Sequence, residues 1–452
     1  MRDLSRIFKA YDVRGVVPAE FDADIARATG AAFVRLLGAE QIVTAHDMRA
    51  SSVPLAAAFA RGATEQGADV IAAGLGSTDL LYYGAGALNI PGAMFTASHN
   101  PAKYNGIKLC RAGAAPIGQE TGLADIRALV EQGVPAGPGR QGSITERDLL
   151  ADYVRHLRTL VDLGGIRPLV VAVDAGNGMG GLTVPAALAD LPLTVIPLYF
   201  ELDGTFPNHE ANPIEPANLR DLQAAVRSSG ADIGLAFDGD ADRCFVVDER
   251  GEIVSPSVIT ALVADRELTR EPGGTIIHNV IVSQGVPKLV RERGGVPVRT
   301  RVGHSFIKAE MARTGAIFGG EHSGHFYFRD FWRADSGMLA ALHVLAALGG
   351  QAGPLSELLG GYARYSASGE INSEVADATL AMLEVEKAYS TSADSVDHLD
   401  GLTITFPNGA WFNLRPSNTE PLLRLNVEGP DDETMQGLRD DVLSLVRSRR
   451  EP

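Results

Sequence analysis

Cysteine is scarce in this chain: its 452 residues include only Cys110 and Cys244, which lie far apart. This scarcity argues against a disulfide framework and a cysteine-ligated zinc site, and it is typical of the reducing cytoplasm. Long apolar runs are also missing, since no stretch approaches the roughly 18 residues that a membrane-spanning helix needs. The N-terminal segment lacks the apolar core of a signal peptide. We therefore expect a soluble cytoplasmic protein with no membrane partner.

Basic residues are in deficit, with 40 Lys and Arg against 56 Asp and Glu and a formal net charge of −16. A nucleic-acid surface needs clustered Lys and Arg, so we expect no nucleic-acid partner. A small anionic ligand is still compatible with this charge, because a few convergent cations can outweigh the global field. The length predicts several domains. We expect a monomer or a weak homodimer.

Helical and strand patterns alternate through most of the chain, which is typical of parallel β-α-β units. In the first third, helical spacing over 21–37 and 55–67 alternates with apolar strands at 41–45, 70–75 and 93–96. A Gly- and Pro-rich segment at 133–142 indicates a linker. Two further blocks repeat the pattern. The second has predicted strands at 169–174, 193–200 and 233–237 and helices at 183–189 and 218–229. The third has predicted strands at 275–281, 296–302 and 317–319 and helices at 286–292, 305–313 and 336–348.

The C-terminal part of the chain changes character. Apolar strands at 402–406 and 410–414 flank an Asn-Gly turn, which predicts a β-hairpin, and an amphipathic helix at 433–447 follows. We therefore predict an α/β protein with three similar mixed α/β domains and a smaller C-terminal α+β domain, arranged around a central cleft. The predicted domains are residues 1–142, 143–251, 252–365 and 366–452.

The first motif, TASHNP at residues 96–101, follows a predicted strand. Ser98 precedes a turn-forming Asn-Pro pair and has His99 beside it and Lys108 further along the chain. This arrangement suits a hydroxyl that carries a group from one place to another. The same residues also fit a plain turn with Ser98 as a helix cap, so the motif alone leaves both interpretations open.

The second motif, DGDADR at residues 238–243, places three carboxylates at alternate positions of a tight turn. Asp238, Asp240 and Asp242 can converge on one hard cation, which predicts a Mg²⁺ site. A solvated acidic turn and an EF-hand loop are the alternatives. Arg243 stands where an EF-hand requires glycine, and strand residues follow instead of a helix, so the EF-hand is disfavoured.

Two further loops carry polar groups suited to a sugar phosphate. GEHSGH at 320–325 offers a carboxylate and a hydroxyl for hydrogen bonds to sugar hydroxyls. RPSNTE at 415–420, with Arg424 beyond it, offers many donors to phosphate oxygens. A polar surface turn is the alternative for each of them.

A competing signal lies at residues 176–181, where GNGMGG matches the dinucleotide-binding pattern G-x-G-x-x-G between a predicted strand and helix. Glu201 ends the next predicted strand, where that fingerprint expects an acid. This signal makes a dinucleotide-dependent oxidoreductase the alternative from another class. Glycines that pack a helix against its strand explain the loop equally well, and the oxidoreductase would leave the other motifs without a function.

The four motifs TASHNP, DGDADR, GEHSGH and RPSNTEP, in this order and spacing, resemble the α-D-phosphohexomutase family. The resemblance covers nearly the whole chain and includes the opening residues 10–15, AYDVRG. The GEHSGH form is most similar to bacterial phosphomannomutases and phosphomannomutase/phosphoglucomutases, whereas phosphoglucosamine mutases usually carry glutamine where this chain has His322. Phosphoglucosamine mutase is therefore the alternative within the family.

The resemblance implies a reversible interconversion of hexose 6-phosphate and hexose 1-phosphate, of mannose and also of glucose, through a phosphoserine enzyme and a hexose 1,6-bisphosphate that also acts as activator. It implies that Ser98 is phosphorylated, that Lys108 is the general acid/base with His99 assisting, and that Arg243 contacts the transferred group. Mg²⁺ would be held by the phosphorylated serine and by the carboxylates Asp238, Asp240 and Asp242.

The resemblance also implies a set of substrate contacts. Glu321 and Ser323 would bind the O3 and O4 hydroxyls, and the loop that follows residue 414 would hold the phosphate that is not transferred. The expected substrate-binding residues are Tyr11, Arg14, His304, Glu321, Ser323, His325, Arg415, Ser417, Asn418, Thr419 and Arg424. Some bacterial members carry a lysine on the third domain's strand where this chain reads HNVIVS at 278–283.

Three mechanistic expectations follow from these residues. Contacts to the O3 and O4 hydroxyls do not distinguish mannose from glucose, because these sugars differ at C2. Activity on both mannose and glucose phosphates is therefore reasonable. Lys108 must at times be neutral to accept a proton, which predicts a lowered pKa. The fourth domain follows a connection near 362–368 and is expected to close over bound sugar. A catalytically silent sugar-phosphate sensor is the alternative from the binding class, which the intact carboxylates and Lys108 disfavour.

Overall fold

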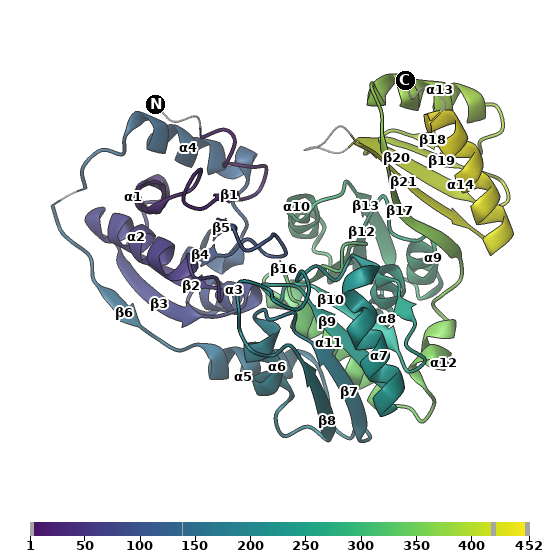
Figure 1. Ribbon diagram of the computed structural model, residues 1–452, viewed down its shortest axis with the longest axis horizontal. Helices are drawn as coiled ribbons and strands as arrows, with labels where there is room; N and C mark the ends of the chain where they lie inside the picture. Colours follow the sequence, from purple (N-terminus) through teal and green to yellow (C-terminus); the bar gives the residue numbers. More distant parts are fainter. Residues whose placement is uncertain (1–3, 138, 417–421, 448–452) are drawn as a thin grey trace. The chain divides into compact units, whose positions relative to one another are not determined.

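The computed structural model describes residues 4–137, 139–416 and 422–447. The chain forms two compact units, one of residues 1–256 with 323–358 and the other of residues 257–322 with 359–452. Figure 1 follows the chain through four groups of strands. The domain boundaries that we predict at 142, 251 and 365 stay predictions. Among the described residues no helix combines the length and apolar character required to cross a bilayer.

The first sheet of unit 1 has six strands in the order β1-β5-β4-β2-β3-β6. Strand β2 pairs in parallel with β3 and β4, which confirms the predicted β-α-β units, whereas β5 is antiparallel to both β1 and β4. The strands are β1 (Val13–Val16), β2 (Gln41–His46), β3 (Asp69–Leu75), β4 (Gly92–Phe95), β5 (Tyr104–Cys110) and β6 (Ile144–Glu146). The helices are α1 (Ala23–Leu37), α2 (Ser52–Glu65), α3 (Thr78–Ala87) and α4 (Leu123–Gln132).

Helix α1 shows how local sequence sets these elements. Asp22 caps its N-terminus by accepting a hydrogen bond from the Ile25 amide, and Gly38 ends it with a left-handed φ of 59°. One apolar face, which includes Phe33, packs against Phe59 of α2 at 5.8 Å between ring centroids. Both helices belong to the apolar core that covers this sheet.

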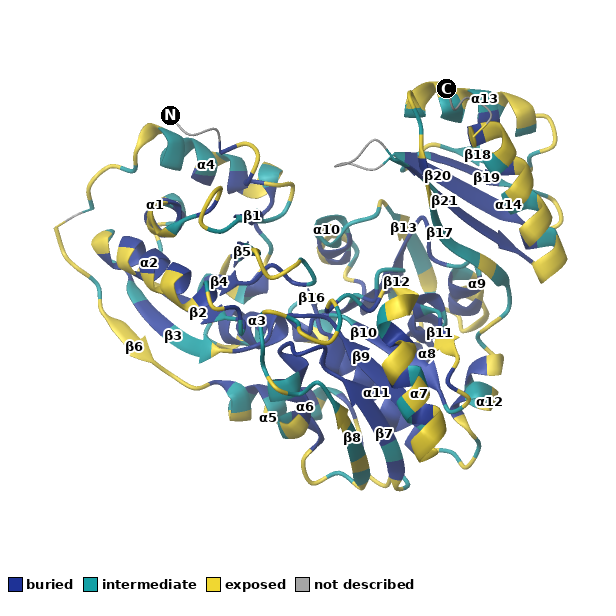
Figure 2. Ribbon diagram, in the orientation of Figure 1, coloured by how far each residue is buried: buried dark blue, intermediate teal, exposed yellow. Residues whose placement is uncertain are grey.

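The second sheet of unit 1 has the order β11-β10-β9-β7-β8, with β7 parallel to both β8 and β9. Strands β9 and β10 form an antiparallel hairpin around the DGDADR turn, and both are buried (Figure 2). The strands are β7 (Leu169–Asp174), β8 (Leu193–Leu198), β9 (Ile233–Phe237), β10 (Cys244–Asp248) and β11 (Ile253–Val254). The helices are α5 (Leu150–Leu160), α6 (Gly180–Leu188) and α7 (Arg220–Ser229).

A third set of elements is shared between the units along the chain. In unit 2, β12 pairs in parallel with β13 and β14, while in unit 1 β15 and β16 form an antiparallel pair beside a buried helix, α11. The strands are β12 (Thr275–Asn279), β13 (Val296–Thr300), β14 (Phe318–Gly320), β15 (Phe326–Phe328) and β16 (Ala334–Asp335). The helices are α8 (Pro256–Arg270), α9 (Gly285–Glu292), α10 (His304–Thr314), α11 (Gly337–Gly349) and α12 (Leu355–Gly360).

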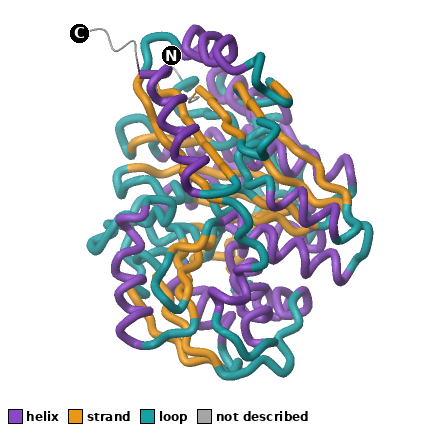
Figure 3. The backbone as a smooth tube through the Cα atoms, turned by 90° about the vertical axis from the view of Figure 1, so that its right-hand side faces the viewer, coloured by secondary structure: helices purple, strands orange, loops and turns teal. Residues whose placement is uncertain are grey.

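The last sheet is antiparallel throughout, in the order β17-β21-β20-β19-β18. The predicted hairpin is confirmed, since Thr405 of β19 pairs with Trp411 of β20 across the Asn-Gly turn. Helix α14 lies along this sheet (Figure 3) and shares its apolar core. The elements are β17 (Ser366–Glu374), α13 (Ala378–Tyr389), β18 (Ser395–Asp397), β19 (Leu402–Thr405), β20 (Trp411–Pro416), β21 (Leu422–Gly429) and α14 (Asp432–Arg447).

Candidate active site

Ser98 lies in the turn that joins β4 to β5 and has a left-handed φ of 50°. A non-glycine residue in this region is strained and persists only where its surroundings hold it. The Ser98 amide donates to Thr96 Oγ1 at 2.8 Å. The Ser98 hydroxyl donates to Asp238 Oδ2 at 2.7 Å and lies 3.2 Å from His99 Nδ1. The turn therefore presents the predicted nucleophile directly to the predicted metal loop.

The three carboxylates of the DGDADR turn are buried, and ligand atoms of Asp238, Asp240 and Asp242 lie within 4.8 Å of one another. Burial, followed by the charges of Asp242 and Asp240, raises the pKa of Asp238 well above its usual value. Asp240 Oδ1 and Asp242 Oδ1 are buried and accept no hydrogen bond from the described residues. Excess negative charge and free oxygen lone pairs at one point fit a hard divalent cation such as Mg²⁺.

Glycine is required where the two loops meet. A Cβ atom at Gly239 would lie 2.4 Å from the Ser98 carbonyl oxygen, closer than any side chain allows. Helix α3 adds a second support, because the Thr78 hydroxyl donates to Asp240 Oδ2 at 2.6 Å. The nucleophile turn and the metal loop are therefore in direct backbone contact within one compact unit.

Lys108 projects from β5 toward the same carboxylates. Its Nζ donates to Asp240 Oδ2 at 2.6 Å and to Asp242 Oδ2 at 2.5 Å. Burial opposes the charge of Lys108, but the adjacent carboxylates of Asp240 and Asp242 outweigh it and raise the pKa of this lysine. The lowered pKa that we expected for Lys108 is therefore wrong, because carboxylates and not other cations are its nearest neighbours.

His99 has the opposite electrostatic setting. Burial, followed by the positive charges of Arg243 and Arg14, holds the pKa of His99 well below its usual value. The imidazole beside Ser98 is therefore neutral at pH 7, and it can accept or donate a hydrogen bond without adding charge to the site.

Arg243 and His325 face each other across the metal loop. Arg243 Nε lies 3.2 Å from His325 Nε2 and 3.5 Å from Asp238 Oδ2. His325 Nδ1 lies 3.0 Å from the Ser323 hydroxyl. The unit 1 part of the GEHSGH loop thus lies against the carboxylate cluster. Arg14 also reaches this region, because its Nη1 donates to the Asn100 side chain of the nucleophile turn.

Most of the remaining predicted contacts lie in unit 2. The buried Glu321 carboxylate accepts hydrogen bonds from the Gly303 amide at 3.0 Å and from Asn279 Nδ2 at 3.2 Å. These contacts connect Glu321 to the start of α10, whose first residue is His304. Tyr11, a half-buried residue of unit 1, lies before β1.

The predicted phosphate loop is described only in part, since Ser417, Asn418 and Thr419 lie outside the described residues. Arg415 and Arg424 are paired across β20 and β21. Glu370 of β17 accepts from both guanidinium groups, at 3.4 Å from Arg415 and 3.1 Å from Arg424. Two cations that share one carboxylate suit the binding of an anion such as phosphate.

Sequence reasoning missed Arg49, which is 2% exposed. Its guanidinium donates to four carbonyl oxygens of the nucleophile turn: Ser98 (2.9 Å), Asn100 (2.6 Å), Pro101 (3.0 Å) and Tyr104 (3.1 Å). Asp47 anchors Arg49 Nε at 3.2 Å. The signal was present, because these charged residues directly follow β2, the parallel neighbour of the strand that leads to Ser98.

Sequence reasoning also missed a buried carboxylate, Asp79, in the first turn of α3. It accepts hydrogen bonds from Tyr153 (2.6 Å), from Ser336 (2.6 Å) and from Ser77. These hydroxyls come from α5 and from the caps of α3 and α11. Burial raises the pKa of Asp79 to about 6, and the three hydroxyl donors oppose this rise.

The glycine-rich loop at 176–181 has a packing role. A Cβ atom at Gly181 would lie 2.1 Å from the Phe200 carbonyl oxygen, so glycine permits close contact between α6 and the end of β8. The Met179 amide donates to the Gly239 carbonyl oxygen at 2.9 Å. The loop therefore packs against the DGDADR turn and holds it by a backbone hydrogen bond. This packing explains the glycines of the loop without a bound dinucleotide.

Comparison with known proteins agrees with this geometry. Models of the phosphoglucomutase/phosphomannomutase family match the chain in four segments: α/β/α domain I at 5–135, domain II at 151–251, domain III at 255–365 and the C-terminal domain at 370–445. The chain belongs to the phosphoglucomutase/phosphomannomutase family. It is a phosphohexomutase, an isomerase that interconverts hexose phosphates. The alternative of a dinucleotide-dependent oxidoreductase is therefore wrong.

Similar proteins cover almost the whole chain. A phosphomannomutase of Escherichia coli is 40% identical, over 97% of this chain and 99% of its own length. A protein of Xanthomonas campestris named "Phosphohexose mutases" is also 40% identical, over 97% of this chain and 99% of its own length. Among solved structures, a phosphoglucomutase/phosphomannomutase family protein of Burkholderia thailandensis has a TM-score of 0.89 and 33% identity, covering 98% of this chain and 97% of that one.

Proposed function

We propose that this phosphohexomutase is a Mg²⁺-dependent phosphomannomutase that also acts on glucose phosphates. The observation that carries the proposal is the Ser98 hydroxyl, which donates to Asp238 at 2.7 Å beside two further buried carboxylates. Relatives named phosphomannomutase support mannose as a substrate. Cys110 and Cys244 are buried and form no disulfide among the described residues, which supports the reducing cytoplasm as the compartment of the protein.

In the proposed reaction, phosphorylated Ser98 donates its phosphoryl group to the free hydroxyl of a hexose phosphate. The bond from phosphorus to Ser98 Oγ breaks, a bond to the sugar oxygen forms, and the sugar hydroxyl's proton is transferred to Ser98 Oγ. The resulting hexose 1,6-bisphosphate turns end for end, and Ser98 takes back the other phosphoryl group. Added 1,6-bisphosphate therefore activates any unphosphorylated enzyme.

Each residue of the site has a role in this proposal. Lys108 holds its proton beside two carboxylates and is suited to give it to Ser98 Oγ as the serine leaves and to take the sugar hydroxyl's proton in its place. Asp238, Asp240 and Asp242 would hold Mg²⁺ together with the phosphoserine. When bound, Mg²⁺ supplies neutralisation of the phosphoryl oxygens, to which Arg243 adds positive charge.

The substrate side of the proposal rests on both units. Ser323 and Glu321 would bind sugar hydroxyls, and Arg415, Arg424 and the residues at 417–419 would bind the phosphate that is not transferred. Tyr11, Arg14, His304 and His325 would contact the substrate as well. The four domains predicted from the sequence would each supply one loop.

The first experiment tests Ser98. The Ser98→Ala variant should lose at least about 1,000-fold in turnover, since no other group can carry the phosphoryl group. Its intact mass should show no phosphoryl group after incubation with glucose 1,6-bisphosphate, whereas the wild-type protein should gain one. Ser228→Ala on exposed α7 is the matched control. Near-normal turnover of Ser98→Ala would end the proposal.

The second experiment tests the sugar. A coupled assay compares mannose 1-phosphate, glucose 1-phosphate and glucosamine 1-phosphate, each primed with a trace of the matching bisphosphate. We expect turnover of the first two and much slower turnover of the third. A preference for glucosamine 1-phosphate would instead support a phosphoglucosamine mutase.

A further inference from the structure

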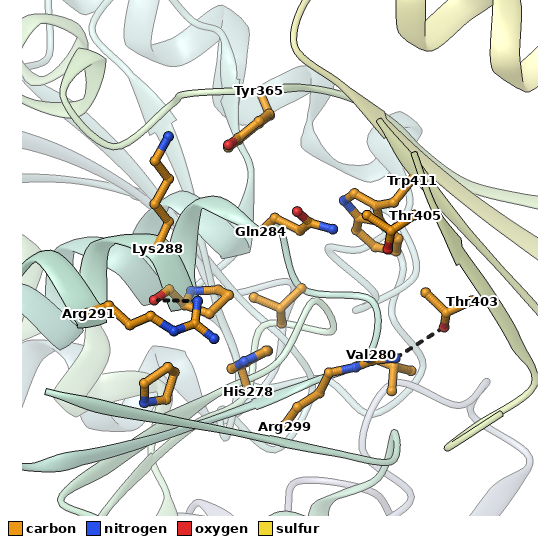
Figure 4. A pocket seen from close by; sticks show the side chains of 13 residues that line it. His278, Val280, Gln284, Lys288, Arg291, Arg299, Tyr365, Thr403, Thr405 and Trp411 are labelled. Carbon is orange, nitrogen blue, oxygen red and sulfur yellow. Dashed lines mark hydrogen bonds between the residues drawn. The ribbon is translucent and has the colours of Figure 1, made fainter. Parts of the chain in front are cut away.

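A cavity of about 400 Å³ lies in unit 2, between β12, β13 and α9 on one side and β19 and β20 on the other (Figure 4). Its lining includes neither Glu321 of the sugar loop nor Arg415 and Arg424 of the phosphate loop. The cavity is of the size that small-molecule sites in proteins occupy. It is therefore a concave site separate from the residues assigned to the reaction.

The lining of this cavity is positively charged. Its 13 residues include Lys288, Arg291 and Arg299 and no carboxylate, although acids outnumber bases by 56 to 40 in the chain. Arg299 pairs with Asp397 at 2.8 Å. No carboxylate among the described residues pairs with Lys288 or Arg291, both of which are exposed. The cavity thus concentrates positive charge in an acidic protein, as an anion site requires.

Neutral polar groups and rings complete the lining. Burial lowers the pKa of His278 to about 4, so its ring is neutral at pH 7. Gln284, Thr403 and Thr405 line the cavity with an amide and two hydroxyls, and Trp411 adds an indole (Figure 4). The lining is therefore more polar than apolar, which suits a charged, strongly hydrogen-bonding ligand.

The two sides of the cavity come from different parts of the family's architecture. Residues 278–299 fall within the match to domain III, and residues 403–411 fall within the match to the C-terminal domain. Tyr365 lies at the connection between them. Glu428 also connects the two sides, because its carboxylate accepts hydrogen bonds from the Gln284 backbone amide at 3.0 Å and from Trp411 Nε1 at 2.9 Å.

We propose that this cavity binds a small metabolite that carries two phosphate groups, such as a nucleoside diphosphate or a sugar bisphosphate, and that the bound metabolite bridges domain III and the C-terminal domain. Lys288 and Arg291 on α9 provide two cations, and Arg299 on β13, which also pairs with Asp397, adds a third on another element, which favours two phosphates over one. Binding at this cavity does not require that the proposed reaction be correct.

The test uses Trp411 as its own reporter. The chain has two tryptophans, so the Trp332→Phe variant leaves Trp411 as the single one. Its fluorescence is titrated in Mg²⁺-free buffer with a nucleoside diphosphate, with glucose 1,6-bisphosphate, with pyrophosphate and with inorganic phosphate. We expect saturable changes for the three probes that carry two phosphate groups and at least tenfold weaker binding of inorganic phosphate. The tightest of the three identifies the source of the ligand.

Variants then locate the response. In the Trp332→Phe background, the double substitution Lys288→Ala/Arg291→Ala should weaken binding at least tenfold. The control Lys387→Ala/Arg313→Ala removes the same charges from α13 and α10, outside the cavity, and should bind as the parent does. Arg415→Ala should also retain the response.

Each contrary result overturns the proposal. If the Lys288→Ala/Arg291→Ala variant binds the probes with the affinity of its parent, the cavity is not the binding site. An equal loss in the control double variant shows a general charge effect, and loss in Arg415→Ala assigns the signal to the phosphate loop of the reaction. A linear, non-saturating titration with every probe also overturns it. Activity assays play no part in these outcomes, so a failure here leaves the proposed reaction untouched.

Discussion

Buried charge is arranged differently in the two compact units. In unit 1, Asp238, Asp240 and Asp242 converge, with Lys108 and Arg243 close by. In unit 2, the guanidinium groups of Arg415 and Arg424 share one carboxylate. Burial of like charges costs free energy unless a partner of opposite charge compensates. The charge that dominates is therefore negative in the unit 1 cluster and positive in the unit 2 cluster, as the proposed cation and phosphate sites require.

The largest expected effect comes from removing one charge of the unit 1 cluster. Asp240→Asn should lower turnover by about 100-fold or more, because an electrostatic contact to the developing charge is typically worth that much. Activity should need a higher Mg²⁺ concentration to reach half its maximum, measured by titration in the coupled assay. Asp232→Asn, which changes a carboxylate directly before β9, at the opposite end of that strand from the DGDADR turn, serves as control. Unchanged Mg²⁺ dependence would break the assignment of a cation to this cluster.

A second variant separates placement of the nucleophile from charge. Arg49→Lys keeps the positive charge but cannot reach all four carbonyl oxygens of the nucleophile turn. We expect kcat to fall by about 10- to 100-fold with KM little changed, because the loss falls on orientation. Arg27→Lys, in an exposed pair with Glu65, should have no effect. A raised KM with a normal kcat would show that Arg49 does not position Ser98.

The unit 2 cluster is tested through its carboxylate. Glu370→Gln removes the group that Arg415 and Arg424 share, and we expect KM to rise about three- to tenfold as both guanidinium groups lose their orientation. The matched control is Glu374→Gln, an exposed residue of the same strand. A fall in KM would instead show that net positive charge alone determines phosphate binding.

The smallest effect concerns Asp79, a buried carboxylate that accepts hydrogen bonds from three hydroxyls. Its folded-state pKa of about 6 lies above the ordinary 3.8, so its contribution to stability is complete below about pH 4 and is lost as the pH rises through 6. The loss amounts to at most about 3 kcal/mol. Asp79→Asn should therefore flatten the plot of Tm against pH between 4 and 7. A parallel plot for wild-type protein and variant would contradict this titration.

The sequence alone predicted the elements whose periodicity is strong. The strands at β7 and β9, the hairpin of β19 and β20 and the helix α14 lie where apolar spacing and the Asn-Gly turn placed them. It missed α3, because that helix is short and its first turn is fully buried, so polar residues such as Asp79 interrupt the apolar pattern.

The same limit applies to the site. Residues close in sequence, such as Ser98 and His99 or the three aspartates, could be grouped by spacing. Glu370 could not, because its partners lie on other strands and no local pattern links them. For Arg49 the only signal was its position after β2, and this position does not identify the carbonyl oxygens that Arg49 contacts. The expectation for the pKa of Lys108 was wrong for the same reason. The sequence shows which residues are charged, but it does not show which of them become neighbours in the fold.

The contact of Gly239 with the carbonyl of Ser98 has one more consequence. Because these two backbones touch, we expect a displacement of the aspartate turn to displace Ser98 with it, which would keep the distance from the serine to the proposed cation nearly constant. In the proposed reaction, the reacting centre of the protein would then stay in place, and the twice-phosphorylated sugar would be the partner that moves.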